Sequence, residues 1–311
     1  MKNFDVYVTN QEPLPWTVII DHPNAWLVGN DSLAINYVRF NLIMDSVQKY
    51  FRKDSVILDI GAYPGLMPKI FYEFYPKSNY EYYGCGLGFD KDFRERMRGF
   101  NVQLLECDLD PRLHLSKGMP TSIPLEDGKA DFCIFTDVIE HFFDPFYPLK
   151  EANRVCKIGA IMILTTDNLA RAALALIKGK SCNVPLIEGN MFYEGDWRPH
   201  FREYSKDELF QLLDWSGFEV LSHKFHDAEF GLYRVSNGRL VKGKRDSTGL
   251  IRKTKDFIIS LLVRVIPYWK DSHILIARKK IDYQTMLKTA PKIVNNLEEW
   301  VLQRKAFTQK C

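Results

Sequence analysis

Short runs of apolar residues alternate with amphipathic segments through the middle of the chain. Segments with helical spacing, such as PGLMPKIFYEFY and DKDFRERMR, separate these runs. Unbroken apolar strands are typical of a parallel sheet that is buried on both faces, and right-handed crossovers place helices on both sides of it. The pattern therefore predicts a doubly wound α/β layer. Its predicted strands are VILDI (56–60), YEYYGC (80–85), VQLLEC (102–107), DFCIFTD (131–137) and AIMILTT (160–166).

Helical periodicity also flanks this region. Apolar residues between 35 and 47 recur at helical spacing behind Asn30-Asp31-Ser32, which can cap a helix. Beyond the fifth strand, residues 169–178 predict a helix, and SKDELFQLLDWSGFEV predicts a helix capped by Ser205, closed by Gly217 and followed by a strand. A helix at about 250–265, a strand near 273–278 and a final amphipathic helix complete the predicted elements.

These patterns divide the chain into four segments. Residues 1–54 are an N-terminal extension with a helix, and residues 55–228 are the α/β core, which includes a long loop at 179–204. Residues 229–280 add a basic insertion, a helix and a final strand that completes the core. Residues 281–311 form a helical tail.

Composition narrows the class of protein. The chain is 46% apolar and 26% charged with 14% aromatic residues, which excludes disorder and collagen-like structure. No apolar run reaches the roughly 18 residues that cross a bilayer, and no apolar run follows the N-terminal lysine as in a secretory signal. We therefore expect a cytoplasmic protein. Its six cysteines form no C-x-x-C pair and are expected to be reduced core residues.

A candidate ligand site follows the first predicted strand, where Asp59-Ile60-Gly61-Ala62-Tyr63-Pro64-Gly65 leads into a helix. Small residues let the backbone approach a ligand closely, and helix-terminal N–H groups can bind polar atoms. A carboxylate at the strand end can pair with an ammonium or a hydroxyl. A tight turn without a ligand would require the same residues, so the pattern alone leaves both interpretations open.

The order of the motifs makes the interpretation more specific. VILDIGAYPG, Asp108 after the third strand, DFCIFTDVIEH and NRVCKIGAIMILTTDN resemble the class I S-adenosylmethionine-dependent methyltransferases over about residues 31–228. The resemblance implies a Rossmann-like fold with a mostly parallel seven-stranded sheet, and S-adenosylmethionine as the cofactor. It places Asp108 at the adenine and Asp59, Gly61 and Gly65 at the amino-acid part of the cofactor. Ala62 and Tyr63, in the same turn, are predicted to bind the cofactor as well.

The end of the second strand departs from that family. An Asp or Glu usually stands there to bind the ribose hydroxyls, about 20 residues past the glycine turn. This chain has Gly84-Cys85-Gly86-Leu87-Gly88 instead. Asp90 is the candidate replacement, and the alternative is that Gly86 and Gly88 leave the ribose to backbone or water. Asp137, at the end of the fourth strand, is predicted to contact the cofactor as well.

Asp137, Glu140 and His141 form a second candidate site. If a helix follows the fourth strand, positions i, i+3 and i+4 share one face, so the two carboxylates and the imidazole would converge. Oxygen and nitrogen ligands suit Mg²⁺, Mn²⁺ or Fe²⁺. The alternative is a metal-free Glu-His pair, which many members of the superfamily carry, with the histidine packed or hydrogen-bonded locally.

The segment HFREYSKDEL adds a further histidine, His200. Two metal-dependent branches are similar here: the ubiquinone-pathway O-methyltransferases at Asp137, Glu140 and His141, and the small-RNA 3′-terminal 2′-O-methyltransferases at these and at His200. Both usually have Glu in place of Asp137. The resemblance implies a divalent cation that lowers the pKa of a hydroxyl and aligns it with the methyl donor. Without a metal, His141 or His200 is the predicted general base.

Two further segments suggest contacts with a substrate or a surface. The loop at 182–202 carries aromatic faces and arginine donors and predicts a substrate lid, or else a surface loop packed on the core: Phe192, Tyr193, Trp197, Arg198 and Arg202. Seven Lys and Arg residues lie between 239 and 255, opposed only by Asp246, next to the apolar stretch at 257–266. This run is either a solvated face or a peripheral contact with an anionic membrane surface or a lipid-linked substrate.

The leading hypothesis is an S-adenosylmethionine-dependent O-methyltransferase that acts on a hydroxyl of a sugar, glycan or related polar metabolite, with or without a metal. The sugar assignment also draws on a general likeness of the tail to methyltransferases of surface-polysaccharide clusters. An RNA 2′-O-methyltransferase is the first alternative, although a net charge of +3 disfavours nucleic acid as a partner. A non-catalytic cofactor-binding module is the second. The turn lacks G-x-G-x-x-G, which disfavours an oxidoreductase. The pattern does not define the acceptor or the oligomeric state.

Overall fold

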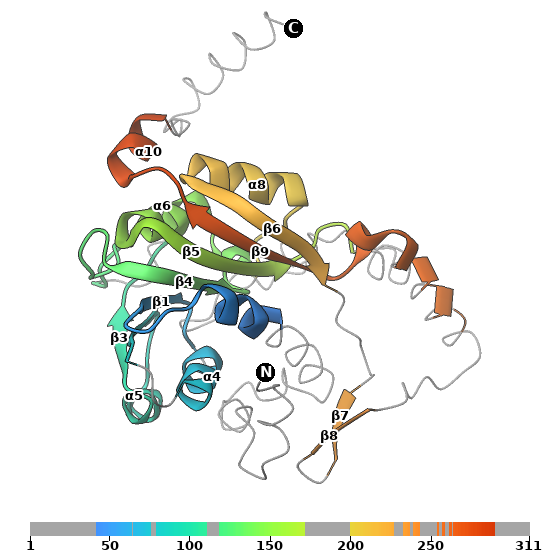
Figure 1. Cartoon of the computed structure of the whole chain (residues 1–311), viewed down its shortest axis with the longest axis horizontal. Helices are drawn as coiled ribbons and strands as arrows, with labels where there is room; N and C mark the ends of the chain where they lie inside the picture. The colour runs from blue at the N-terminus through green and yellow to red at the C-terminus, as the bar shows by residue number, and fades with distance from the viewer. Residues whose placement is uncertain are drawn as a thin grey trace, which may run out of the picture.

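A seven-stranded sheet forms the centre of the molecule (Figure 1). The computed structural model describes residues 42–63, 65–75, 79–110, 118–171, 200–226, 233–236, 239–242, 254, 257–258, 261–262 and 264–289. In spatial order the strands are β3 (Val102–Glu106), β2 (Glu81–Gly86), β1 (Val56–Ile60), β4 (Ala130–Thr136), β5 (Cys156–Asp167), β9 (Ser272–Lys279) and β6 (Phe218–His226). Only β9 runs antiparallel to its neighbours. The predicted fold class, a mostly parallel seven-stranded sheet, is confirmed.

Helices cover both faces of the sheet (Figure 1). The helical residues 42–50, α4 (Leu66–Phe74) and α5 (Lys91–Gly99) pack on one face. The helices α6 (Phe146–Val155) and α8 (Lys206–Trp215) pack on the other face. The 3₁₀ turn η2 (Ile139–His141) follows β4, and α10 (Tyr283–Thr289) follows β9.

The two faces have separate hydrophobic cores because successive strand residues point to opposite sides. In β1, Ile57 belongs to the core under α4 and α5, whereas Leu58 belongs to the core under α6 and α8. In β5, Ile163 and Leu164 divide in the same way. This double burial explains why the strands read as unbroken apolar runs. The cysteines at 85, 107, 133 and 156 are buried and unbridged, as predicted.

Several predicted segments lie partly or wholly outside the described residues. These are the N-terminal extension up to residue 41, Pro64, the helix at 172–178, the lid up to residue 199 and the tail beyond 289. Within the predicted basic insertion, the structure describes a two-stranded pair, β7 (Tyr233–Ser236) and β8 (Arg239–Lys242). Further on, the described positions between 254 and 265 are helical and lead into the 3₁₀ turn η4 (Pro267–Trp269). Among the described helices, none is both long and apolar enough to span a bilayer.

Candidate functional site

The predicted site residues gather at one edge of the sheet, where the parallel strands end. The strand order places β1 beside β4, so the chain turns toward opposite sides of the sheet after these two strands. In open α/β sheets a crevice forms at this switch point, outside the carboxyl ends of the strands. In this chain the glycine turn after β1 and the 3₁₀ turn η2 after β4 both stand at this switch point.

The turn after β1 requires glycine at two positions. Gly61 and Gly65 have φ angles of 81° and 90°, which residues other than glycine rarely adopt. A Cβ atom on Gly61 would lie 2.3 Å from Val138 Cγ2, and one on Gly65 would lie 2.5 Å from Met97 Cε. Gly65 precedes α4 as its N-cap without a side-chain cap, so the first turn of this helix presents backbone N–H groups to the edge of the sheet.

Asp59 is a buried carboxyl directly beneath this turn. Its side chain is 2% exposed, and the Tyr82 hydroxyl donates a hydrogen bond of 2.7 Å to its Oδ2. Burial raises the pKa of Asp59 from 3.8 to about 7, and the bond from Tyr82 opposes that rise. A cationic group placed near Asp59 would lower its pKa again, because an opposite charge stabilises the ionised form.

Tyr63 and Asp90 meet at the start of α5. The rings of Tyr63 and Phe93 lie 5.0 Å apart, and Asp90 caps α5 by accepting a 2.7 Å hydrogen bond from the Phe93 amide. Burial and the charge of Asp90 both raise the pKa of Tyr63. Tyr63 is therefore packed against α5, and Asp90 already has a structural role as a helix cap.

Glu106 is a residue that the sequence interpretation missed. It ends β3 in direct register with Gly86, at the end of β2 where the expected acid is absent. Its carboxylate accepts a 3.1 Å hydrogen bond from the Phe89 amide and pairs with Arg94 at 2.5 Å, and its side chain is 33% exposed. The only signal in the sequence is the Glu that closes the apolar run VQLLEC, and its neighbour across the sheet is visible only in the structure.

Asp108 and Asp110 follow β3 and are both buried. Asp108 Oδ1 accepts a 3.0 Å hydrogen bond from the Asp110 amide, and Asp110 Oδ2 accepts one of 2.5 Å from the Phe143 amide. Asp110, which was not predicted, therefore ties the loop after β3 to the segment that follows η2. Asp108 keeps its predicted place at the carboxyl end of β3.

Three of the predicted metal ligands converge. One ligand atom each from Glu140, His141 and His200 lies within 4.8 Å of the others. The rings of His141 and His200 are 4.6 Å apart and nearly perpendicular, at 84°. Glu140 is 1% exposed and accepts a 2.7 Å hydrogen bond from the Thr166 hydroxyl, while its carbonyl accepts one of 2.7 Å from the Phe201 amide. We call these three residues the histidine cluster.

Asp137 is placed apart from the histidine cluster. It has a φ angle of 51°, and η2 begins only at Ile139, so the helical i, i+3, i+4 spacing expected from Asp137 onward does not form. Asp137 Oδ1 accepts a 2.6 Å hydrogen bond from Thr165, whereas Glu140 accepts from Thr166. Because adjacent strand residues point to opposite faces, Thr165 and Thr166 hold the two carboxylates on different sides of β5.

A second group of carboxylates adjoins His200. Asp167, His200 and Glu203 also bring one ligand atom each within 4.8 Å. His200 Nδ1 lies 3.6 Å from Asp167, and Arg171 pairs with both Asp167, at 3.2 Å, and Glu203. Burial lowers the pKa of His200, Asp167 opposes this and Arg171 adds to it. His200 is therefore held neutral near pH 7. Asp167 and Glu203 were not predicted, although they stand at the strand end in ILTTDN and beside His200 in HFREY.

Arg202 is the described end of the predicted lid. It pairs with Glu208 of α8, and its guanidinium lies 5.0 Å from the centre of the Tyr204 ring. Tyr204 is fully buried, and its hydroxyl donates a 3.3 Å hydrogen bond to the Ile139 carbonyl. These contacts fix the segment 200–204 against η2. The aromatic residues of the predicted lid, with Arg198, lie outside the described residues.

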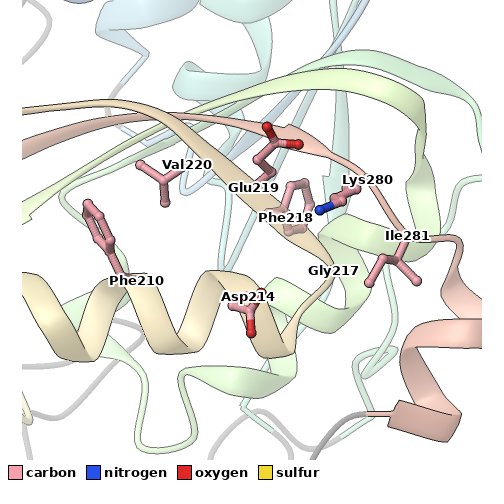
Figure 2. A pocket seen from close by; sticks show the side chains of 8 residues that line it. All are labelled: Phe210, Asp214, Gly217, Phe218, Glu219, Val220, Lys280 and Ile281. Carbon is pink, nitrogen blue, oxygen red and sulfur yellow. The ribbon is translucent and has the colours of Figure 1, made fainter.

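A pocket of about 290 Å³ lies at the other ends of the strands from the candidate site, where β6 begins and β9 ends (Figure 2). Figure 2 shows Phe210 and Asp214 on α8 facing the start of β6. The pocket contains neither glycine-turn residues nor histidine. Its lining residues are Phe210, Asp214, Gly217, Phe218, Glu219, Val220, Lys280 and Ile281. It is therefore separate from the predicted site at the carboxyl ends of the strands.

Comparison with known proteins agrees with the fold. A family model described as a methyltransferase domain matches residues 35–223. A "Probable S-adenosylmethionine-dependent methyltransferase" from Mycolicibacterium smegmatis is 31% identical over 148 residues, which cover 44% of this chain and 50% of that protein. The chain thus matches about half the length of this relative.

Solved structures with a similar fold are more distant. A SAM-dependent methyltransferase from Thermotoga maritima is 17% identical, with a TM-score of 0.46, and the match covers 86% of this chain and all of that one. The [4+2]-cyclase SpnF is 14% identical, with a TM-score of 0.44, and the match covers 77% of this chain and 81% of that one.

Proposed function

The chain belongs to the methyltransferase-domain family, and from this premise we propose that it transfers a methyl group from S-adenosylmethionine to a hydroxyl of a sugar, glycan or related polar metabolite. The observation that carries the proposal is the contact between the two parts of the site. A Cβ on Gly61 would strike Val138, and Val138 directly precedes the turn that bears Glu140 and His141. A donor held by the glycine turn would therefore lie beside an acidic, imidazole-lined surface.

The residues around the glycine turn suit a donor that carries an ammonium, a ribose and an adenine. The positive-φ glycines let the turn pack closely against Val138 and Met97, and the buried Asp59 carboxyl offers a partner for an ammonium. Asp108 stands at the carboxyl end of β3 for the adenine. We assign the ribose contact to Glu106, which lies in register with Gly86, rather than to Asp90, which caps α5. When bound, S-adenosylmethionine supplies an electrophilic methyl group.

The histidine cluster supplies the acid–base chemistry in this proposal. A hydroxyl holds its proton near neutral pH and must lose it as the new bond to carbon forms. His200, with a lowered pKa, is neutral and can accept this proton at a ring nitrogen. Asp167, 3.6 Å from His200 Nδ1, can stabilise the imidazolium that results. His141, in edge contact with His200, helps to orient the ring.

A divalent cation is the second candidate for activating the hydroxyl. One carboxylate and two imidazoles form the donor set of Glu140, His141 and His200, which suits Mn²⁺ or Fe²⁺. Metal bonds of about 2.1 Å place the ligands of one ion roughly 3 Å apart, so atoms separated by up to 4.8 Å would have to move closer together. A bound cation would lower the pKa of the acceptor hydroxyl. Asp137, turned toward Thr165, is not included in this set.

Two measurements test the proposal. Calorimetric titration with S-adenosylhomocysteine should show binding that Glu106→Gln weakens, and Asp90→Asn should weaken it less. Turnover of a panel of sugars and sugar nucleotides should yield a methyl ether, identified by mass spectrometry and NMR. No heat with either form of the cofactor would contradict the proposal, as would methylation only at nitrogen. Full turnover in excess chelator would remove the metal alternative.

A further inference from the structure

One helix of the molecule exposes its apolar side chains. Phe257, Ile258, Leu261 and Val265 are 67%, 48%, 51% and 72% exposed. At 100° per residue these four positions fall within an arc of about 100°, so they form one continuous face of the helix. We call these four residues the apolar stripe. Tyr268 in the adjoining η4 is also 52% exposed and extends the apolar surface.

An apolar face of this kind calls for a partner. Apolar residues scattered singly over a surface are ordinary, but a contiguous apolar patch usually marks an interaction site. Half of the large apolar residues exposed in the described part of the chain lie between 257 and 268. The others are Tyr72, Phe143, Ile158, Trp215 and Leu287, which are spread over different elements.

The charge around the apolar stripe indicates the chemistry of the partner. Between residues 239 and 270 the sequence has nine Lys or Arg residues and two Asp residues, whereas the whole chain is nearly balanced at 42 basic and 39 acidic residues. Arg264 lies within the helix and is exposed. A short amphipathic helix with basic flanks suits an anionic lipid surface, since the apolar face enters the acyl boundary while the cations meet the headgroups.

We propose that the apolar stripe docks this protein on the surface of an anionic lipid bilayer. Tyr268 and Trp269 follow the stripe directly, and amphipathic aromatic rings of this type favour the headgroup level of a membrane. The partner is a lipid surface rather than a nucleic acid, because a nucleic acid would attract the cations but would leave Phe257, Leu261 and Val265 exposed to water.

The segment that directly follows the apolar stripe is anchored at the carboxyl end of β5, where the candidate site lies. The Asn168 side-chain amide donates hydrogen bonds of 2.8 and 2.6 Å to the carbonyls of Tyr268 and Lys270, and the Asn168 amide N–H donates one of 2.8 Å to Asp271. Asn168 follows Asp167 at the carboxyl end of β5. Figure 1 shows this helix, in orange, beyond that end of the sheet. Docking would therefore hold the candidate site near the lipid surface, whatever reaction it catalyses.

Co-sedimentation of the full chain with vesicles tests the proposal. We expect binding to vesicles of phosphatidylcholine and phosphatidylglycerol in a two-to-one ratio, and little binding to phosphatidylcholine alone. The double variant Phe257→Ser/Leu261→Ser should lower the partition coefficient by at least about ten-fold, because two apolar side chains no longer leave water. Arg264→Gln should lower it by about five-fold at low salt, and added salt should weaken wild-type binding.

Ile158→Ser is the matched control, because the exposure of Ile158, at 60%, lies between those of Phe257 and Leu261, but Ile158 is near the start of β5, at the other end of the strand from Asp167. It should bind like the wild type. Circular dichroism and thermal unfolding of each variant should match the wild type, which would exclude misfolding as the cause of lost binding. Three results would overturn the proposal: no binding to anionic vesicles, equal binding to neutral ones, or a wild-type dimer that dissociates in the double variant while neither protein binds vesicles.

Discussion

The glycine turn after β1 packs against Val138, which directly precedes the two cluster residues of η2, but different physical features shape the turn and the histidine cluster. The conformation of the turn requires residues without a side chain, because a Cβ on Gly61 would collide with Val138. The geometry of the cluster requires particular hydrogen-bonding groups, because the Thr166 hydroxyl and the Phe201 amide donate hydrogen bonds that hold Glu140 in place. Backbone conformation therefore defines one side of the site, and side chains from three separate segments define the other.

This difference determines what a substitution should do on each side. An added atom at the turn must be accommodated by the backbone or by Val138, so the cost falls on folding and on binding together. A lost side chain in the cluster leaves the backbone in place, so the cost falls on the reaction. The comparison predicts that binding and turnover can be separated by mutation, and the following variants test this separation.

His200→Gln should show the largest effect. Removing a general base costs about 10²–10⁴ in rate, so kcat should fall by about three orders of magnitude while the affinity for S-adenosylhomocysteine stays within about two-fold. In the wild type the base must be neutral, and the pKa of His200 is lowered. The rate should therefore rise as pH increases through a value below 6.5 and should then stay flat through pH 7. Stopped-time assays across pH measure both effects.

His223→Gln is the control for this variant. It removes an imidazole of β6 whose Nε2 lies 3.0 Å from Nδ1 of His273 and which is not part of the histidine cluster. Unchanged kcat in His200→Gln would contradict the base assignment. An equal loss in His223→Gln would indicate that the change acts through packing rather than through the cluster.

Gly61→Ala should follow in size. Placing alanine at a φ of 81° costs about 1–2 kcal/mol, and displacing Val138 costs about 1–3 kcal/mol more. We expect the free energy of unfolding to fall by about 2–5 kcal/mol and cofactor affinity to fall by about a hundred-fold. Gly159→Ala is the matched control, because it has a φ of 83° and no atom within 4 Å of the added Cβ. Denaturant titration should give it only the backbone cost, and equal losses in both variants would contradict the steric argument.

The sequence predicts the turn better than the cluster for a physical reason. Gly61 and Gly65 indicate local backbone conformations, and a local conformation depends mainly on the residue types at and next to that position. The apolar runs likewise predict the sheet, because burial on both faces leaves no polar period. The structure confirms both the strands and their mostly parallel arrangement.

The remaining features depend on long-range pairing. Asp137 and Glu140 are separated because their partners Thr165 and Thr166, 28 and 26 residues away, point to opposite faces of β5. Glu106 lies beside Gly86 only through the register of β2 and β3. Neither relation leaves a periodic trace in the chain. Helical spacing, together with the resemblance to two metal-dependent branches, therefore placed Asp137 with the cluster.

The threonine pair sharpens the comparison at a smaller scale. Thr166→Val removes the hydroxyl that donates to Glu140, and Thr165→Val removes the one that donates to Asp137, with little change in shape. Each lost bond should cost about 1–1.5 kcal/mol, or about ten-fold. We expect Thr166→Val to lower kcat and Thr165→Val to weaken S-adenosylhomocysteine binding. Measuring both constants for both variants checks this, and the opposite assignment of effects would place Asp137 with the acceptor rather than with the cofactor.

The smallest expected effect is the release of a fraction of a proton from Asp59 when the ligand binds. The pKa of Asp59 is raised from 3.8 to about 7, so in the free protein about half of the molecules hold the proton at pH 7. The folded state keeps that proton longer than the unfolded state, so Asp59 makes the protein less stable as pH rises from about 4 to 7. An ammonium bound beside Asp59 would lower its pKa and release about half a proton.

Titration calorimetry in phosphate and in Tris measures this release, because the two buffers differ in their heat of protonation. The apparent binding enthalpy of S-adenosylhomocysteine should differ between the buffers in the wild type and should agree in Asp59→Asn. If the wild-type heats were also equal, no proton would move on binding, and Asp59 would be a buried structural partner of Tyr82 instead of a partner for the ammonium. The turn would then bind its ligand through backbone groups alone, whereas the histidine cluster acts through side chains.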